Sequence, residues 1–580
     1  MLNVPDGLEL RPAGSRTEHR RRRRSVLAVA AIAVVAGSGC FALTTSAADA
    51  ASRTLLVPTT YRTISAAVKA AHSGDTVLVA PGTYRENVTI DGKYVVVRAR
   101  STNPAATVIT GRAGRTTVMI ANVPTRRGVP RAALIGFRVT GGSASGGTGG
   151  GITALNHGDA LIEKNLIDGN RAQHGGGVLV YGSSNPVITY NTIRGNHGSI
   201  MGGGVFVAMH SSPRIYGNTI QSNTVSGGTT PGGGPSGGGI YISNDGNNPA
   251  ATRSAPNVSR NTIVGNTVSF AGGGIVLGTG ANAIIASNRI SSNRSAYGGG
   301  IHIENHGAAP SITQNLIEAN TAARSSAYPG SGSGGGISVF GGSRPKIGHN
   351  TIRANRTSYA GGGIVLAESS FSAVNGNRII GNQVVPGITG SFGGGIGVAT
   401  AGGRLTNNVM QSNSAPVGGG IAMLGTGAVQ VVNNVIVSNN ATLASFAAGG
   451  GLYIGAKPVN STSIINNVVT DNNDYQIFEN GRIARYSANL VTNTGKGLFF
   501  SFPAHELHSA AQFNGNAKVL YAHGNIATAP TFIDAATGNL ALAAGSAGVN
   551  QGTALGATGV DINNRARPVG GRFDVGAWER

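Results

Sequence analysis

Residues 272–293 read GGGIVLGTGANAIIASNRISSN, and this unit returns along the chain with small variations. It holds three short apolar stretches, each alternating as a β-strand does and each too short for a helix. Glycine and asparagine separate the stretches, and both tolerate the left-handed backbone conformation of a sharp corner. The unit therefore predicts three short strands joined by three tight corners.

Two motifs alternate along the chain, with 25 to 36 residues from one glycine triplet to the next. A glycine triplet followed by an aliphatic residue begins at Gly149, Gly175, Gly202, Gly237, Gly272, Gly298, Gly334, Gly361, Gly393, Gly418 and Gly449. Between the triplets lie eleven copies of N-x-(aliphatic)-x-x-N, from NLIDGN to NVVTDN. One such repeat predicts one turn of a parallel β-helix, with aliphatic residues stacked inside and asparagine ladders along the outside.

The pattern resembles the right-handed parallel β-helix repeats of the pectin-lyase-like superfamily, over roughly residues 54–490. The resemblance implies an all-β fold, a single right-handed parallel β-helix with a short N-terminal capping helix. Two other repeat folds are excluded. The triplets lack the Asp of a calcium-binding β-roll, and the six-residue period of a left-handed hexapeptide helix is absent.

Both ends of the repeat region carry capping signals. A short amphipathic helix is expected from about Ile64 to Ala71, with Thr63 capping its start and Gly74 ending it. Strands are expected around 77–79 and 95–97. This stretch resembles the opening segment of secreted bacterial β-helix proteins, which carry Y-x-T-I-x-x-A and G-D-T-V motifs.

The C-terminal sequence DINNRARPVGGRFDVGAWER, residues 561–580, is similar to a D-x-x-x-R…R-P…D-x-G-A-x-E tail found on such proteins. We interpret it as a terminal cap, in which Asp561, Asp574 and Glu579 make turn and cap contacts. The predicted organisation is a signal peptide at 1–50, an N-terminal cap and first coils at 51–140, repeats at 141–475, and last coils with a cap at 476–580.

The first 50 residues indicate export, to the medium or the cell surface. Arg20 to Arg24 precede an apolar stretch of 18 residues, and Ala48-Asp49-Ala50 fits an A-x-A cleavage site. Arg23-Arg24 also resembles a twin-arginine signal. Cleavage after Ala50 removes Cys40, the only cysteine, and leaves no membrane span in the mature chain. An uncleaved anchor stays open, because 18 apolar residues are near the minimum for a span.

The charge balance favours anionic partners. The chain has a formal net charge of +22 with only 11% charged residues. Residues 51–140 alone hold thirteen Lys or Arg against three acids. Such a field attracts uronic-acid polysaccharide, teichoic acid, nucleic acid or phospholipid, although solubility alone also explains it. An anionic polysaccharide is the predicted partner; no nucleic acid and no cofactor is expected, and the sequence does not give the oligomeric state.

Enzymes of the superfamily that the chain resembles place their sites on the outward face of one sheet. If the aliphatic residue after each triplet points inward, the next residue points outward. Those outward positions gather aromatic and titratable side chains on one face. Sugar-binding aromatics are expected at Tyr181, Phe206 and Tyr241, and catalytic groups at His302, Glu304, His306, His210 and Asp245. A carboxylate beside an imidazole transfers protons near neutral pH.

The densest part of this face is GGGIHIENH, residues 298–306, where His302, Glu304 and His306 alternate. As metal ligands they would span roughly 13 Å on a flat strand, which is too wide for one ion, so no metal is predicted. Polar residues on an exposed rung of a soluble solenoid are the alternative explanation. The signatures of pectin hydrolases, alginate epimerases and pectate lyases are missing, which lowers the expectation of an enzyme.

Two features beside the face leave alternatives open. Insertions at 224–236 and 321–333 either wall a groove or are solvated loops. Aromatic residues shortly before the triplets (Phe270, Tyr297, Tyr359, Phe392 and Phe446) are expected as stacked corner residues. The predicted function is an exported protein that binds polysaccharide. It is either a lyase or glycoside hydrolase of an acidic glycan, or a non-catalytic adhesin or structural rod of the cell envelope.

Overall fold

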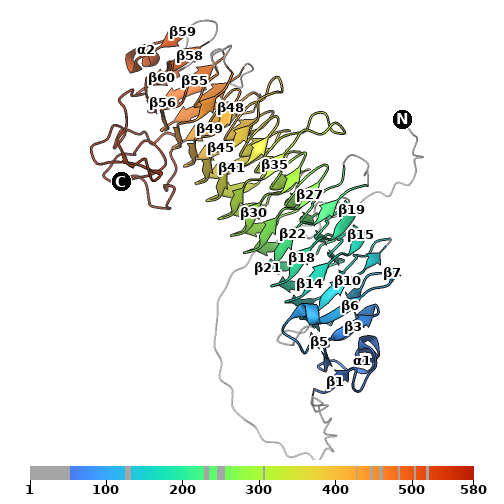
Figure 1. Cartoon of the computed structure of the whole chain (residues 1–580). Coiled ribbons are helices and arrows are strands. Elements are labelled where there is room, and N and C mark those ends of the chain that lie inside the picture. Colours follow the sequence, from blue (N-terminus) through green and yellow to red (C-terminus); the bar gives the residue numbers. More distant parts are fainter. Residues whose placement is uncertain are drawn as a thin grey trace, which may run out of the picture. The chain divides into compact units, whose positions relative to one another are not determined.

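The computed structural model describes residues 52–580, apart from 125–131, 145, 228–233, 245–254, 305–306, 426, 444–447, 456–461, 481–483, 502–504 and 517–520. The predicted signal peptide and Cys40 lie outside this part of the chain. Residues 52–580 form one unit of stacked parallel strands (Figure 1). In the described residues, no helix is long and apolar enough to cross a membrane.

Most coils contain four strands rather than the three expected. In one coil these are β12 (Ile152–Leu155), β13 (Ala160–Glu163), β14 (Leu166–Asp168) and β15 (Arg171–His174). Equivalent strands pair in parallel and build four sheets of 16, 17, 15 and 12 strands. We call them the triplet, second, third and fourth sheets. Most fourth-sheet strands are two residues long, such as β31 (Arg294–Ser295), which is too short to show a sequence period.

The triplet sheet follows the glycine triplets and carries the candidate site. Its strands are β4 (Val88–Asp91), β8 (Val118–Ala121), β12, β16 (Val178–Tyr181), β20 (Val205–Val207), β24 (Ile240–Ile242), β28 (Ile275–Leu277), β32 (Ile301–Ile303), β36 (Ile337–Val339), β40 (Ile364–Leu366), β44 (Ile396–Val398), β48 (Ile421–Met423), β52 (Leu452–Ile454), β55 (Tyr475–Glu479), β58 (Gly497–Ser501) and β59 (His505–Leu507). Among the described strands of this sheet, the pairing of β58 with β59 is the one that is antiparallel.

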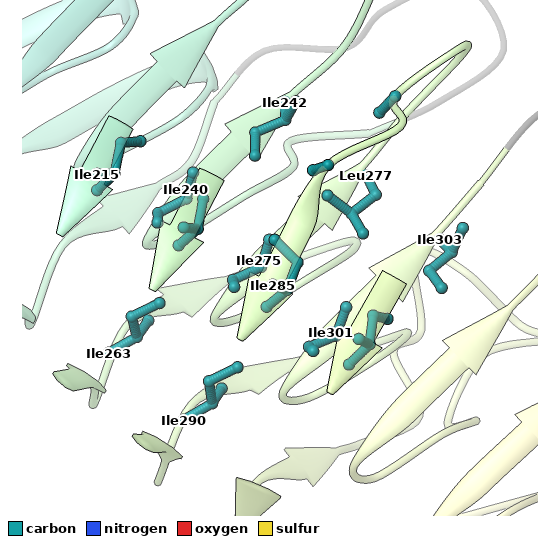
Figure 2. Packing of buried hydrophobic residues seen from close by; sticks show 14 of the residues in the cluster. Ile215, Ile240, Ile242, Ile263, Ile275, Leu277, Ile285, Ile290, Ile301 and Ile303 are labelled. Atoms are coloured by element: carbon teal, nitrogen blue, oxygen red, sulfur yellow. The ribbon is translucent and has the colours of Figure 1, made fainter. Parts of the chain in front are cut away.

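The predicted inward stacking of aliphatic residues is confirmed. Ile275 pairs with Ile301 and Leu277 with Ile303 in the registered strands β28 and β32, and all four side chains are fully buried. Figure 2 shows them facing isoleucines of the second and third sheets. Each such side chain contributes about 1.5–3 kcal/mol by its removal from water, so the repeat supplies its own core.

The triplets are glycine for reasons of space and backbone conformation. Gly272 adopts φ +64°, which a side chain would strain. A Cβ on Gly273 would lie 2.6 Å from the Gly299 carbonyl oxygen, and one on Gly274 would lie 2.5 Å from that of Gly300. Successive coils therefore approach too closely at this corner for any other residue.

The asparagines form ladders, but these are buried rather than on the outside. Asn288 is 2% exposed, and its Nδ2 donates to Oδ1 of Asn315 at 3.0 Å and to the Val258 carbonyl at 2.8 Å. The left-handed conformation belongs to the preceding residue, Ser287, with φ 55°. The first ladder runs through Asn165, Asn191, Asn218, Asn261, Asn288, Asn315, Asn350, Asn377, Asn408, Asn434, Asn467, Asn489 and Asn525.

The N-terminal cap is confirmed. Helix α1 (Ile64–Ala70) starts at Thr63, whose Oγ1 accepts from the Ala66 N–H at 3.1 Å, and its apolar face is buried on the core. The helix ends because Ala71 is extended; Gly74, at φ +96°, lies beyond that end rather than forming it. Strands β2 (Thr76–Val79) and β5 (Val96–Ala99) occupy the predicted places.

The C-terminal end differs from the expected terminal cap. Helix α2 (Ala510–Asn514) covers the last coils, with Phe513 fully buried in the core. The tail, which includes β61 (Phe532–Asp534) and β62 (Asn539–Leu542), packs instead on the outer face of the third sheet. That face carries outward valines, such as Val409, Val435 and Val468, where most earlier coils carry Thr or Arg. The tail therefore covers an apolar flank.

The acidic residues of the tail make structural contacts, as the sequence predicted. Arg567 and Glu579 form a fully buried ion pair at 3.2 Å. Asp561 accepts from the N–H groups of Asn563 and Arg565, and Asp574 accepts from the Asn550 N–H at 2.7 Å. Their carboxylates satisfy buried backbone donors and lie far along the chain from the candidate site.

Candidate functional site

The outward rung of the triplet sheet is buried, although it faces away from the core. Phe206, Tyr241, Val276 and His302 stand in register on neighbouring strands, and their exposed fractions are between 0% and 7%. Each triplet corner folds back over this rung; a Cβ on Gly237 would lie 2.7 Å from Cβ of Tyr241. These side chains are therefore not explained as the polar residues of an exposed rung in this part of the sheet.

A pocket of about 520 Å³ opens on the face that the sequence singled out. All three predicted sugar-binding aromatics line it. The lining residues are Gly147, His174, Leu179, Tyr181, Met201, Phe206, Ala208, Met209, Tyr241, Ser243, Asn244 and Thr279. The register of β16, β20 and β24 brings these aromatics together, because neighbouring strands of a sheet are only about 4.8 Å apart.

The aromatic rings do not form a flat open platform. Phe206 and Tyr241 stack with centroids 5.5 Å apart and planes at 7°, and His174 lies 5.0 Å from Phe206 on a tilted ring. The faces of Phe206 are thus partly covered by its neighbours. Tyr181 is only half-buried and is more open to solvent than Phe206 and Tyr241, which are buried.

His174 is a lining residue that the sequence reasoning missed. It ends β15 directly before the triplet at Gly175, and burial lowers the pKa of its imidazole. Met201 occupies the same position before Gly202. The expected corner aromatics pack in the same way: Phe270 meets Tyr297 edge to face at 5.4 Å, and Tyr359 meets Phe392 at 5.8 Å. Phe446 lies outside the described residues.

His302 and Glu304 take part in a hydrogen-bond network beside the pocket. Nε2 of His302 lies 3.2 Å from Oε2 of Glu304, and its Nδ1 lies 2.6 Å from Oγ of Ser338. The Tyr241 hydroxyl reaches Glu304 across Gly278, which has no side chain to block it. Burial, together with the Glu304 charge, raises the pKa of Tyr241 well above its usual value. Tyr241 is therefore a proton donor in this network at neutral pH.

The order Ser338–His302–Glu304 has the composition of a hydrolytic triad but not its accessibility. Ser338 is 0% exposed and His302 is 4% exposed. A Cβ on Gly298 would lie 2.6 Å from Oγ of Ser338, so the triplet corner covers the hydroxyl. A nucleophile must reach its substrate, and this serine does not. The contacts satisfy buried polar groups, and a catalytic role for His302 or Glu304 stays a prediction.

Of the remaining predicted catalytic residues, the structure describes only His210. His210 follows β20 in a turn at φ 59° and does not line the pocket. Asp245 and His306 lie outside the described residues, so both stay predictions. Among the residues that the structure describes, no group of three or more His, Cys, Asp or Glu side chains is placed to hold a metal ion.

A family profile described as the right handed beta helix region matches residues 135–255 and 254–436. These matches cover more than half of the 580 residues. The chain belongs to the right-handed β-helix family. No curated protein matches the sequence significantly. The handedness expected from the repeat is thereby confirmed.

Three solved structures resemble this β-helix at low sequence identity. The pectate lyase Pel9A is 15% identical, over 91% of this chain and 96% of that one, with a TM-score of 0.29. The alginate lyase of Paenibacillus sp. str. FPU-7 is 13% identical over 56% and 95%, with a TM-score of 0.26. The Dettilon tailspike protein is 13% identical, over 67% of this chain and 64% of that one, with a TM-score of 0.33. These likenesses concern the fold alone.

Proposed function

We propose that this β-helix is exported and binds a polysaccharide, without cleaving it, in the pocket over β16, β20 and β24. One observation carries the proposal. The aromatic side chains that the repeat places on neighbouring strands line a pocket of about 520 Å³, together with a few polar groups. Concave sites that are mostly apolar, with a few placed polar groups, are the usual form of small-molecule and saccharide sites.

The lining suits the two chemical faces of a sugar. Tyr181, Met201 and Met209 offer apolar and aromatic surface to the C–H groups of a pyranose ring. Ser243, Asn244 and Thr279 offer hydrogen-bonding groups to hydroxyls. Oδ1 of Asn244 is buried and has no hydrogen-bond partner among the described residues.

The lining also limits which part of a glycan enters. Its described residues include no Lys, Arg, Asp or Glu, and burial keeps His174 neutral at neutral pH. The pocket therefore suits an uncharged portion of the chain. If the glycan is acidic, as the net charge of +22 suggests, its charged groups must bind elsewhere on the molecule.

Binding without cleavage follows from the placement of the acid–base groups. A glycosidase needs two carboxyl groups beside the scissile bond, and among the residues that the structure describes no carboxylate lines the pocket. A lyase is the second candidate, favoured only by the lowered pKa of His174, which leaves an unprotonated base in the pocket. Elimination from a uronate also needs a cation near its carboxylate, and the lining offers none.

The test is a panel of neutral and acidic polysaccharides, with binding followed by affinity electrophoresis and cleavage by unsaturated-uronide absorbance and reducing ends. We expect retention by at least one glycan and no product. Tyr181→Ala should weaken that binding by roughly tenfold, about 1.4 kcal/mol for a lost aromatic contact. Tyr190→Ala is the matched control, because Tyr190 is 54% exposed and lies outside the pocket lining. Product formation, or equal binding by both variants, would contradict the proposal.

A further inference from the structure

We propose that the fourth sheet carries a second binding site, a groove that holds the carboxylate or sulfate groups of an anionic polysaccharide. The inference rests on the proposed function and names the charge class of the glycan. Its floor is formed by β23 (Thr224–Val225), β27 (Thr267–Val268) and β31. The insertion that follows β35 (Thr321–Ala322) forms one wall, so this insertion does wall a groove.

The groove has a volume of about 600 Å³ and is lined by hydroxyl groups and arginine. The lining residues are Thr224, Val225, Ser226, Thr267, Val268, Ser269, Arg294, Ser295, Ala296, Ala323, Arg324, Ser325 and Ser326. Arg324 also lines a hollow of about 400 Å³ on the far side of the insertion, together with Ser331 and Tyr359. Arg324 is therefore shared by two adjoining depressions of one surface.

The charge of this surface is of one sign. None of the fourth-sheet strands carries an Asp or Glu residue, and its outward rung includes Arg171, Arg294 and Arg356. In the part of the chain that the structure describes, Arg294, Arg324 and Arg356 form no ion pair with an acidic side chain. Exposed guanidinium groups without an internal partner are available to an external anion.

On the third sheet of the same coils, by contrast, arginines form ion pairs with an acidic side chain. Arg289 and Arg353 both bind the carboxylate of Glu318, each at an N–O distance of 2.8 Å or less. Their charge is partly offset within the protein. Among the described residues, Arg289 and Arg353 are thus paired within the protein, whereas Arg294, Arg324 and Arg356 are not.

Spacing and chemistry favour a glycan over other anionic polymers. Arg294, Thr321 and Arg356 are successive rungs in register, so the two arginines are about 9.6 Å apart along the sheet, comparable with a disaccharide repeat. Thr224, Ser226, Thr267 and Ser269 add hydroxyls on the neighbouring coils. The described residues that line this groove of about 600 Å³ include no aromatic side chain on which a nucleic-acid base could stack.

The test uses the whole mature chain and affinity electrophoresis in gels containing polygalacturonate, dextran sulfate or unmodified dextran, with a single-stranded DNA oligonucleotide as competitor. The variant is Arg294→Ala/Arg324→Ala. Its matched control is Arg289→Ala/Arg353→Ala, which removes the same charge from the third sheet. We expect the first variant to bind polygalacturonate or dextran sulfate at least about tenfold more weakly, while the control binds within about twofold of the parent protein.

Four outcomes decide the matter. A loss confined to the first variant supports the groove, and the better-bound polymer of the two identifies carboxylate or sulfate as the ligand group. An equal loss in both variants overturns it, because net charge alone then explains binding. Equal retention by unmodified dextran overturns the role of anionic groups. Competition by the oligonucleotide at lower concentration than by either glycan overturns the polysaccharide class.

The experiments can refute the pocket and the groove independently of each other. Tyr181→Ala should leave the arginine-dependent part of binding unchanged. If Arg294→Ala/Arg324→Ala loses anionic glycan while Tyr181→Ala alters no glycan, the groove stands and the pocket proposal fails. The reverse pattern overturns the groove and leaves the pocket.

Discussion

Replacing Asn288 by alanine tests the buried asparagine ladder, on which the whole solenoid depends. The side chain makes four hydrogen bonds: it accepts from N–H and Nδ2 of Asn261 and donates to the Val258 carbonyl and to Asn315. Each buried hydrogen bond contributes about 1 kcal/mol, so their loss amounts to about 4 kcal/mol. Alanine also leaves the Asn261 N–H buried without an acceptor. This unpaired group lowers the free energy of unfolding beyond the effect of the smaller side chain.

The assay is urea unfolding followed by circular dichroism, with hydrogen exchange to locate the change. Solenoid stability is a sum over coils and their interfaces, so exchange should accelerate first in β25 (Asn257–Ser259), β29 (Ile284–Ala286) and β33 (Ser311–Thr313). The matched control is Asn563→Ala, at an exposed asparagine of the tail, with an expected change within about 0.5 kcal/mol. Equal urea midpoints for the two variants would refute the stabilising role of the ladder.

Three further outcomes follow from the structure. Arg567→Ala leaves Glu579 buried without its ion-pair partner, which should lower the free energy of unfolding by about 3–5 kcal/mol and expose the tail to limited proteolysis. The control Arg572→Ala changes an exposed arginine and should leave the tail protected. Equal cleavage of the two variants would contradict the stabilising role of the pair. Tyrosines of the unfolded chain ionise near pH 10, whereas Tyr241 keeps its proton in the folded state because its pKa is raised. The free energy of unfolding should therefore fall as the pH rises above about 10, and it should fall less steeply in Tyr241→Phe. Urea midpoints of the parent protein and of Tyr241→Phe that change equally between about pH 8 and 10.5 would argue against this. Export predicts a mature N-terminus at Ala51, which N-terminal sequencing of the exported chain checks, and an unprocessed Met1 would count against cleavage.

The sequence predicted those parts of the fold that repeat. Ile275 and Leu277 show the strand period, and the triplets and asparagines return often enough to define a coil. The fourth strand escaped prediction because a segment such as Arg294–Ser295 is too short to have a period. The buried position of the asparagine ladders also escaped, since a polar amide reads as an outside residue unless its partners on the next coil are known.

The sequence predicted which side chains of the candidate site share a face, but not how deeply they are buried. Alternation placed Tyr181, Phe206 and Tyr241 on one face, and the structure has them in one pocket. The same alternation placed His302 on an exposed rung, yet the triplet corner at Gly298 covers that rung. His174 was missed because its importance comes from packing before a triplet, a position that the periodicity does not mark.

The central claim is that the pocket over β16, β20 and β24 holds an uncharged portion of a polysaccharide. A crystal structure of the mature protein with an oligosaccharide of the best-retained glycan tests it most directly. We expect an intact sugar against Tyr181, with its hydroxyls hydrogen-bonded to Ser243 or Thr279. A sugar bound only elsewhere on the solenoid, or a cleaved product in the pocket, would contradict it.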